Sequence, residues 1–487
     1  MWWSENLESI IYIFIVTAYA ISIFMVMGVM ILENRNPLKS LSWILVLLLL
    51  PGLGIVLYVF FGQNFRKEKI IKRKGLKNHD YISKIAHAQT QALSENEWSS
   101  DDVIQDKASI IQLQLNNSDS VVTTGNSVTL LNNGDQKFDS LIEELKKAKH
   151  FIHLQYYIFA RDTIGNIIKD ILLEKVKEGV KVRMIVDDVG SWELKKDYFK
   201  MMRAAGIEIY SFLEVRFPIF TSKVNYRNHR KIVVIDGYVG FVGGINVADR
   251  YIHGKEGLGK WRDTHIKIEG DAVNSLQYIF SLDWYFVSQQ ELANEEYFPI
   301  KKPQDNKMVQ ISASGPDTDW PGIMMGFFKI ITTAKKYVYL ATPYFMPNES
   351  VLMALKTAAM GGVDVKILIP EKSDALITKL STMSYLKEMM LSGVKIYFYK
   401  KGFIHSKVIV SDDIVSSIGS ANIDFRSFEQ NFEVTSFIYD EDFAREVKQT
   451  FKDDFADSDR LIYAEWRKRP LKQKAKESLA RLLSPLL

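Results

Sequence analysis

The second part of the chain repeats itself, and the repeat limits the folds that the chain can adopt. Residues 151–159 and 337–345 are similar apolar segments, and each follows a lysine-bearing stretch. Two more pairs of apolar segments follow in the same order, each with a glycine as its first or second residue. They lie at 179–187 and 362–370, and then at 205–210 and 392–397. Short apolar segments that alternate with longer helical stretches are typical of an α/β fold. The sequence therefore predicts two repeated α/β domains, with mixed sheets covered by helices and packed pseudo-twofold.

Each half then delivers a histidine, a lysine two positions later and an aspartate five positions after the lysine. The two motifs are His229, Lys231 and Asp236 in the first half, and His405, Lys407 and Asp412 in the second, and these six are the candidate catalytic residues. The neighbouring residues are β-branched and apolar, so we expect each motif on a buried strand, with histidine and lysine on the same face. Asp236 precedes a glycine, which is a hairpin signal, so we expect both aspartates at turns.

A turn of small residues that ends in asparagine follows each motif. Gly244 and Asn246 lie in the first turn, Ser420 and Asn422 lie in the second, and we expect these four residues to bind the phosphate group of the substrate. Two lysines and two asparagine amides can hold the oxygens of a phosphodiester without a metal ion. The chain has no cysteine and no acid–histidine cluster at ligand spacing, so we expect neither a metal site nor a cofactor.

Paired motifs of this kind suit transfer of a phosphoryl group. One neutral imidazole can attack phosphorus, and the other, when protonated, can donate a proton to the leaving oxygen. Since each half supplies one histidine and one lysine, we expect a single pseudo-twofold site at the interface of the halves. The spacing itself does not choose which histidine attacks.

The two HxKxxxxD motifs with their GGxN and GSxN turns resemble the signature of the phospholipase D superfamily, in which two copies form each active site. The resemblance implies that His229 is the nucleophile that forms a phosphohistidine and that His405 is the acid and base. It also implies that an acidic residue orients each histidine. Asp263 and Glu433 are the candidates, with Asp263 assigned to His229; a carboxylate that caps a turn stays the alternative for both.

Two apolar runs precede the repeat. Residues 10–32 and 41–62 contain no charged residue, and each run exceeds the roughly 20 residues that a helix needs to cross a bilayer. We expect a transmembrane helical hairpin in residues 1–65, although Pro51 and Gly52 leave a kinked or re-entrant second segment as an alternative. Because no Lys or Arg lies before residue 10 and seven lie in 66–77, the positive-inside rule places the catalytic part in the cytoplasm.

The remaining boundaries follow from composition and from the repeat. Residues 66–117 are polar and weakly periodic, so we expect a helical connector there. The first repeated domain then covers 118–300 and the second covers 301–487. The tail from 467 to 481 carries seven bases among leucines, and it fits either an anionic lipid surface or a solvated helix packed on the second domain.

Several segments resemble the bacterial cardiolipin synthases in particular. They are the apolar runs ahead of the paired motifs, residues 344–347, residues 422–433 and the C-terminal 466–487. This resemblance implies condensation of two phosphatidylglycerol molecules to cardiolipin and glycerol at a bacterial cell membrane. A phospholipase D, another phosphatidyltransferase or an inactive membrane scaffold is the alternative. The formal charge of +4 is small for a nuclease, so we expect no nucleic-acid partner, and a homo-oligomer stays open.

Overall fold

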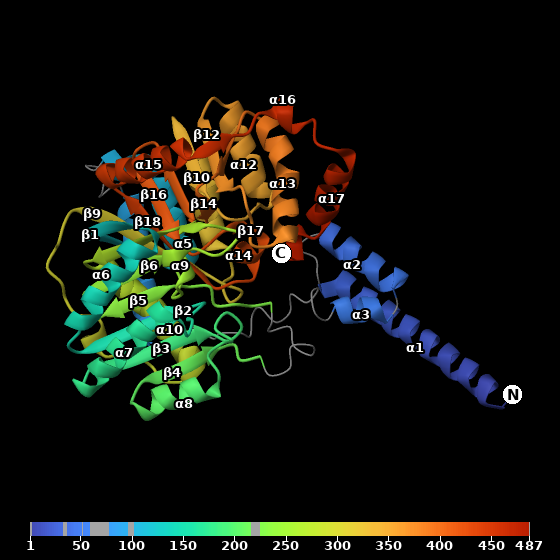
Figure 1. Cartoon of the computed structure of the whole chain (residues 1–487), viewed down its shortest axis with the longest axis horizontal. Coiled ribbons are helices and arrows are strands. Elements are labelled where there is room, and N and C mark those ends of the chain that lie inside the picture. Colours follow the sequence, from blue (N-terminus) through green and yellow to red (C-terminus); the bar gives the residue numbers. More distant parts are fainter. Residues whose placement is uncertain are drawn as a thin grey trace. The chain divides into compact units, whose positions relative to one another are not determined.

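The computed structural model describes residues 2–32, 37–50, 52–58, 77–95, 102–215 and 225–486. The chain divides into two compact units, one of residues 1–70 with 215–224 and the other of residues 71–214 with 225–487 (Figure 1). The loop at 33–36 and most of the basic cluster at 66–77 lie outside the described residues.

Three helices form the described part of the N-terminal unit: α1 (Trp2–Leu32), α2 (Pro37–Leu49) and α3 (Leu53–Leu57). Within α1, the apolar stretch Ser9–Gly28 is long enough to cross a membrane, and among the described residues it alone meets that criterion. Leu47 and Tyr58 are buried against Met25 and Val26 of α1. Near its C-terminal end, α1 therefore packs against the segment that follows it.

The second apolar run does not form one continuous spanning helix, so that expectation was wrong in its simple form. The 13 residues of α2 cover about 20 Å, well short of a bilayer core of about 30 Å. The chain breaks at Gly52, whose φ of 85° is a left-handed conformation that glycine adopts freely. The second apolar run therefore agrees with the alternative of a kinked or re-entrant segment.

The large unit is built on one sheet of 15 strands. Their order is β19-β13-β12-β10-β15-β16-β18-β9-β1-β8-β6-β5-β2-β3-β4. The first-half strands are β1 (Val122–Asn132), β2 (Phe151–Tyr156), β3 (Lys181–Asp187), β4 (Glu208–Phe212), β5 (Ile232–Ile235), β6 (Val239–Gly243) and β8 (Thr264–Glu269). Their counterparts are β9 (Lys307–Ser314), β10 (Tyr337–Ala341), β12 (Asp364–Pro370), β13 (Lys395–Tyr399), β15 (Val408–Ser411), β16 (Val415–Gly419) and β18 (Glu433–Tyr439), with β19 (Ser458–Arg460) added at the edge.

The two halves meet at the antiparallel pair β1–β9. Going outward from this pair, the strands of the first half and their counterparts in the second half follow in the same order. On each side the sheet is mixed: β2 and β10 each pair with one parallel and one antiparallel neighbour. The predicted repeat of two mixed α/β halves is therefore present, but the halves share one continuous sheet. The division at residues 117 and 300 stays a prediction.

Helices cover both faces of the sheet (Figure 1). In the first half they are α6 (Asn133–Lys147), α7 (Thr163–Lys177), α8 (Lys196–Ala204) and α10 (Ala272–Ser288). Alternation along β2 shows the two faces. Ile152 and Leu154 enter the core beneath α6 and α7, whereas the His153 ring stacks on Phe280 of α10 at 4.6 Å.

The second half repeats this arrangement. Its helices are α11 (Gly322–Thr332), α12 (Glu349–Met360), α13 (Leu376–Leu391) and α15 (Glu441–Ala456). Two earlier helices, α4 (Lys77–Ser94) and α5 (Asp102–Ser118), belong to the same core. Ile110, Ile111 and Leu115 of α5 are buried in the second-half cluster with Phe327 of α11. The described part of the expected connector, α4 and α5, is thus packed against the second half.

The C-terminal tail forms α16 (Tyr463–Trp466) and α17 (Leu471–Leu482). Arg481 pairs with Glu388 of α13 at 2.6 Å and lies over the ring of Tyr385. The tail is therefore a helix packed on the second half, which was one of the two alternatives. Leu479 and Leu482 point to solvent, and their contact with lipid stays a prediction.

Asp236 and Asp412 lie in the turns after β5 and β15, where the sequence places them. The Asp236 carboxylate accepts hydrogen bonds from the backbone N–H groups of residues 149, 150 and 151 at 2.7–2.8 Å, and Asp412 does the same for residues 335, 336 and 337 at 2.8–3.0 Å. Each aspartate thus fixes the start of a central strand, β2 or β10. Neither lines the cavity described below, so their inclusion among the catalytic residues was wrong.

We expect Asp236→Ala to destabilise the fold without entering the chemistry. It leaves three N–H groups at the start of β2 without their acceptor and places alanine at a φ of 52°. The free energy of unfolding should fall by about 1–2 kcal/mol, chiefly because alanine disfavours the left-handed φ and also because three hydrogen bonds near the surface are lost. Denaturant unfolding of the detergent-solubilised chain measures this.

Asp236→Asn is the matched control, because asparagine tolerates this φ and keeps one acceptor oxygen. Its loss of stability should be smaller. Unchanged stability of Asp236→Ala together with lost turnover would contradict the structural role.

Candidate active site

The two histidines lie just before strands, not on them. His229 precedes the first residue of β5 by three positions, and His405 precedes that of β15 by the same number. The segment before each histidine runs alongside a segment of the other half. The His229 N–H donates to the carbonyl of Phe432 at 2.9 Å, and the His405 N–H donates to the carbonyl of Arg262 at 2.7 Å. The short strand β14 (Gly402–Ile404) likewise pairs in parallel with β7 (Lys260–Arg262).

These backbone pairings bring each histidine to the carboxylate of the opposite half. Nδ1 of His229 lies 3.0 Å from both oxygens of Glu433, and Nδ1 of His405 lies 2.8 Å from Oδ2 of Asp263. Both acids are therefore partners of histidines, but the expected assignment of Asp263 to His229 was wrong. Because the residues next to each acid pair with the segment of the other motif, the bonds cross the interface.

The small residues of the two turns serve these carboxylates. Ser420 donates its hydroxyl hydrogen bond to Glu433, and Asn431 adds a bond of 3.2 Å to the same group. A Cβ on Gly244 would lie 2.2 Å from Oδ1 of Asp263, so glycine leaves room for that carboxylate. Gly244 and Ser420 were expected to bind phosphate, but neither lines the cavity.

Lys231 and Lys407 lie behind the histidines. Both are buried, and each ammonium donates to the backbone carbonyl of its own histidine, at 2.6 Å in Lys231. Burial lowers the pKa of Lys231 to about 7 and that of Lys407 to about 8, against the opposing attraction of Asp263 and Glu433. The lysines do not line the cavity, but their positive charges act on the two histidines that do.

Burial also lowers the pKa of each catalytic-motif histidine to about 4. Glu433 partly opposes this at His229, whereas Lys407 adds to it at His405 and Asp263 opposes it. Without ligand, both imidazoles are therefore neutral at pH 7. An anion bound between them would favour protonation of one ring.

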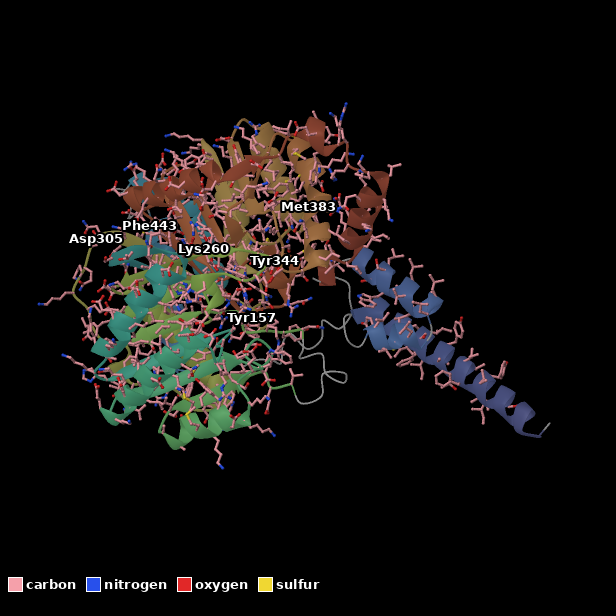
Figure 2. The ribbon with its side chains drawn as sticks, viewed as in Figure 1. Tyr157, Lys260, Asp305, Tyr344, Met383 and Phe443 are labelled. Carbon is pink, nitrogen blue, oxygen red and sulfur yellow. The ribbon has the colours of Figure 1, made fainter. Side chains whose placement is uncertain are left out.

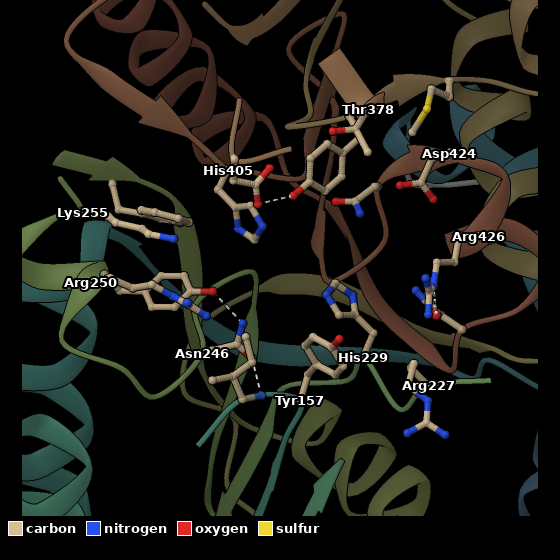
Figure 3. A pocket seen from close by; sticks show the side chains of 18 residues that line it. Tyr157, Arg227, His229, Asn246, Arg250, Lys255, Thr378, His405, Asp424 and Arg426 are labelled. Carbon is tan, nitrogen blue, oxygen red and sulfur yellow. Dashed lines mark hydrogen bonds between the residues drawn. The ribbon is translucent and has the colours of Figure 1, made fainter. Parts of the chain in front are cut away.

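Both histidines face a cavity of about 340 Å³ that draws its walls from both halves (Figure 3). Asn246 and Asn422 line it, as expected. Asn246 is fixed by bonds to the Ile158 N–H and the Tyr251 hydroxyl, at 3.0 and 2.6 Å.

Tyrosines from the two halves complete the wall. Tyr157 and Tyr344 lie where the halves meet (Figure 2). The Tyr157 ring packs edge-on against His229 with centroids 5.0 Å apart, and the Tyr344 ring is edge-on to His405 at 6.4 Å.

Several charged residues of the cavity were missed by sequence reasoning: Arg227, Arg250, Lys255, Asp374, Asp424 and Arg426. The repeat carried a signal for two of them, because Arg250 and Arg426 each follow the turn asparagine by four positions. Arg227 is a buried partner of Asp187 at 3.2 Å. Burial raises the pKa of Asp424 to about 6.

Comparison with known proteins agrees with this geometry. A family model described as "Cardiolipin synthase, PLD-like domain" matches residues 141–284 and 327–455, and a model described as "Phospholipase_D-nuclease N-terminal" matches residues 18–63. The first pair of segments contains both motifs. The second covers parts of both apolar runs.

Whole-chain relatives carry the same description. The chain is 42% identical to "Cardiolipin synthase 2" of Bacillus anthracis, over 96% of this chain and 91% of that protein. It is 40% identical to "Major cardiolipin synthase ClsA" of Bacillus subtilis, over 96% and 98%.

Among solved structures, a phosphatidylserine synthase from Haemophilus influenzae shares the fold. Its TM-score is 0.60 at 16% identity, and the match covers 78% of this chain and 99% of that one. Fold, paired motifs and whole-chain relatives agree: the chain belongs to the bacterial cardiolipin synthases of the phospholipase D superfamily.

Proposed function

We propose that the protein condenses two molecules of phosphatidylglycerol into cardiolipin and glycerol through a phosphohistidine on His229. The family supports the overall reaction. The observation that carries the mechanism is the pair of imidazoles that face one cavity, each with its Nδ1 held by a carboxylate. That bond orients the Nε2 atom of each ring toward the substrate.

In the first step, the donor phosphodiester lies between the two rings. Since Nδ1 of His229 donates to Glu433, Nε2 keeps its lone pair and attacks phosphorus. The bond from phosphorus to the glycerol oxygen breaks, and that oxygen takes the proton from Nε2 of His405. Asp263 stabilises the imidazolium of His405 before the transfer.

The second step reverses these roles with a new alcohol. The terminal hydroxyl of a second phosphatidylglycerol gives its proton to Nε2 of His405 and attacks phosphorus, and the bond to His229 breaks. Cardiolipin leaves, and both rings return to their starting states. Throughout, the charges of Lys231 and Lys407 and the amides of Asn246 and Asn422 stabilise the phosphoryl oxygens.

The N-terminal unit associates the protein with the membrane in which both lipids reside. The apolar stretch of α1 supports one crossing, and α2 and α3 would return the chain as an interrupted segment. The bases at 66–77 favour the cytoplasmic side for the large unit. Anionic lipid is then the surface that the basic helix α17 meets.

A product assay tests the reaction. Purified protein in mixed micelles is given phosphatidylglycerol labelled in its glycerol head group, and lipids and free glycerol are quantified. One cardiolipin for each glycerol released is the expected result. Phosphatidic acid in place of cardiolipin would identify a phospholipase D, and no turnover would identify a scaffold.

A trapping experiment tests the nucleophile. With phosphorus-labelled phosphatidylglycerol, the His229→Ala protein should remain unlabelled. The His405→Ala protein should accumulate an acid-labile, base-stable label slowly, because it lacks the acid that protonates the leaving glycerol, and should then retain it, because it lacks the base that activates the second alcohol. Label on His229→Ala and none on His405→Ala would assign the nucleophile to His405.

The pH profile follows from the lysines. Their lowered pKa values mean that the charged forms dominate below about pH 7 and are lost as the pH rises through 7–8. Because kcat/KM reports the free enzyme, the pKa of about 4 at His405 already makes kcat/KM for cardiolipin formation fall gradually above pH 4. We expect loss of the lysine charges to make that fall steeper between pH 7 and 8. Initial rates from pH 5 to 9.5 measure it, and a slope that does not change up to pH 9 would contradict the role of the lysines.

A further inference from the structure

The proposed reaction brings two anionic lipids into one cavity. The donor phosphate lies between the histidines, but the acceptor phosphatidylglycerol carries a phosphodiester of its own, one glycerol unit away from the attacking hydroxyl. Bringing that second negative charge into a partly desolvated cavity is unfavourable unless cations meet it. The acceptor site is therefore expected to contain cations that the donor site does not use.

Two such cations lie on the His405 side of the cavity. Arg250 and Lys255 point into it from the first half, opposite Arg227 and Arg426 (Figure 3). The guanidinium of Arg250 lies over the ring of Trp261, with 5.7 Å to the centroid, and that ring lies 5.8 Å from His405.

Arg250 and Lys255 differ from most of the buried cations in having no carboxylate of the described residues within ion-pair distance. In the described part of the chain, no ion pair involves Arg250 or Lys255, and Nε of Arg250 is buried without a hydrogen-bond partner. The Arg250 side chain is held instead by the faces of Tyr251 and Trp261. An anion in the cavity would supply the missing partner.

The equivalent positions on the His229 side differ in charge. Arg426 follows the buried Asp424 by two positions, where the first half has Ala248 before Arg250. Lys255 follows Asn246 by nine positions, and the residue at that distance from Asn422 is Asn431, which accepts from Arg426 at 3.4 Å. Arg426 thus has the Asn431 oxygen as a partner, whereas the buried Nε of Arg250 has none among the described residues. The cavity also contains Asp374, whose carboxylate acts on His405 and accepts a hydrogen bond from the Tyr344 hydroxyl at 2.7 Å.

The direction of attack favours the same side. His229 occupies one side of phosphorus, so the leaving glycerol and the incoming hydroxyl both pass on the opposite side, next to His405. We infer that Arg250 and Lys255 bind the phosphodiester of the acceptor phosphatidylglycerol and so select an anionic lipid alcohol over water or a neutral alcohol. This inference rests on the proposed function.

The test compares two acceptors in one protein. Cardiolipin formation uses the anionic acceptor, and exchange of labelled glycerol into phosphatidylglycerol uses a neutral one at the same donor site. In the Arg250→Gln/Lys255→Gln protein, the ratio of the cardiolipin rate to the exchange rate should fall by about tenfold or more, as expected from the loss of charge-assisted hydrogen bonds. The Arg250→Lys/Lys255→Arg protein keeps the charge and should keep a larger part of the ratio.

Two matched controls complete the experiment. Arg426→Gln removes the cation on the donor side, so it should lower both rates together and change the ratio less than twofold. Lys200→Gln removes an exposed lysine of α8 and should change neither rate.

An unchanged ratio in Arg250→Gln/Lys255→Gln, an equal loss of both reactions, or a larger change of ratio in Arg426→Gln would each overturn the inference. Failure of the proposed function looks different, because the wild-type protein would then form no cardiolipin.

Discussion

The hydrogen bonds that cross between the halves, from His229 to Glu433 and from His405 to Asp263, are the constraint on which the site depends. All four groups are buried, and an isolated buried carboxylate is costly without a cationic or hydrogen-bonding partner. Each half therefore supplies the carboxylate that holds the histidine of the other half. The continuous sheet across β1 and β9 and the backbone pairing beside each histidine hold these partners in register.

Because each histidine hydrogen-bonds the acid of the opposite half, the sequence predicted which residues form the site better than it predicted which acid contacts which histidine. Repetition identified both motifs and both asparagine turns, because equivalent positions in two halves can be seen in the sequence, and the family resemblance then indicated both acids. Repetition did not indicate that Asp263 serves His405, since a repeat gives equivalence and not proximity. Arg250 was missed although Arg426 recurs at the same distance from its turn asparagine, because a recurring arginine does not by itself show that the side chain lines a cavity.

Outside the active site, prediction from the sequence failed where the structure depends on backbone conformation or on contacts between distant segments. Hydropathy gave the extent of the second apolar run, but the break at Gly52 depends on a backbone conformation. The polarity of the segment before residue 118 concealed Ile110, Ile111 and Leu115, whose buried face is defined by the distant helix α11. Tertiary packing decides such cases, and local periodicity does not.

The separation of each histidine from its acid also bears on how the chain is made. Glu433 lies 204 residues after His229, so at a synthesis rate of about 5–20 residues per second the acid emerges roughly 10–40 s after the histidine. Helix α5 likewise cannot bury its apolar face until α11, against which it packs, has been synthesised. A nascent chain that has completed its first half therefore exposes an unfinished interface, with β1 as an open sheet edge, until the second half leaves the ribosome. Tethering by the N-terminal apolar helix during that interval would keep this exposed edge away from other chains in solution.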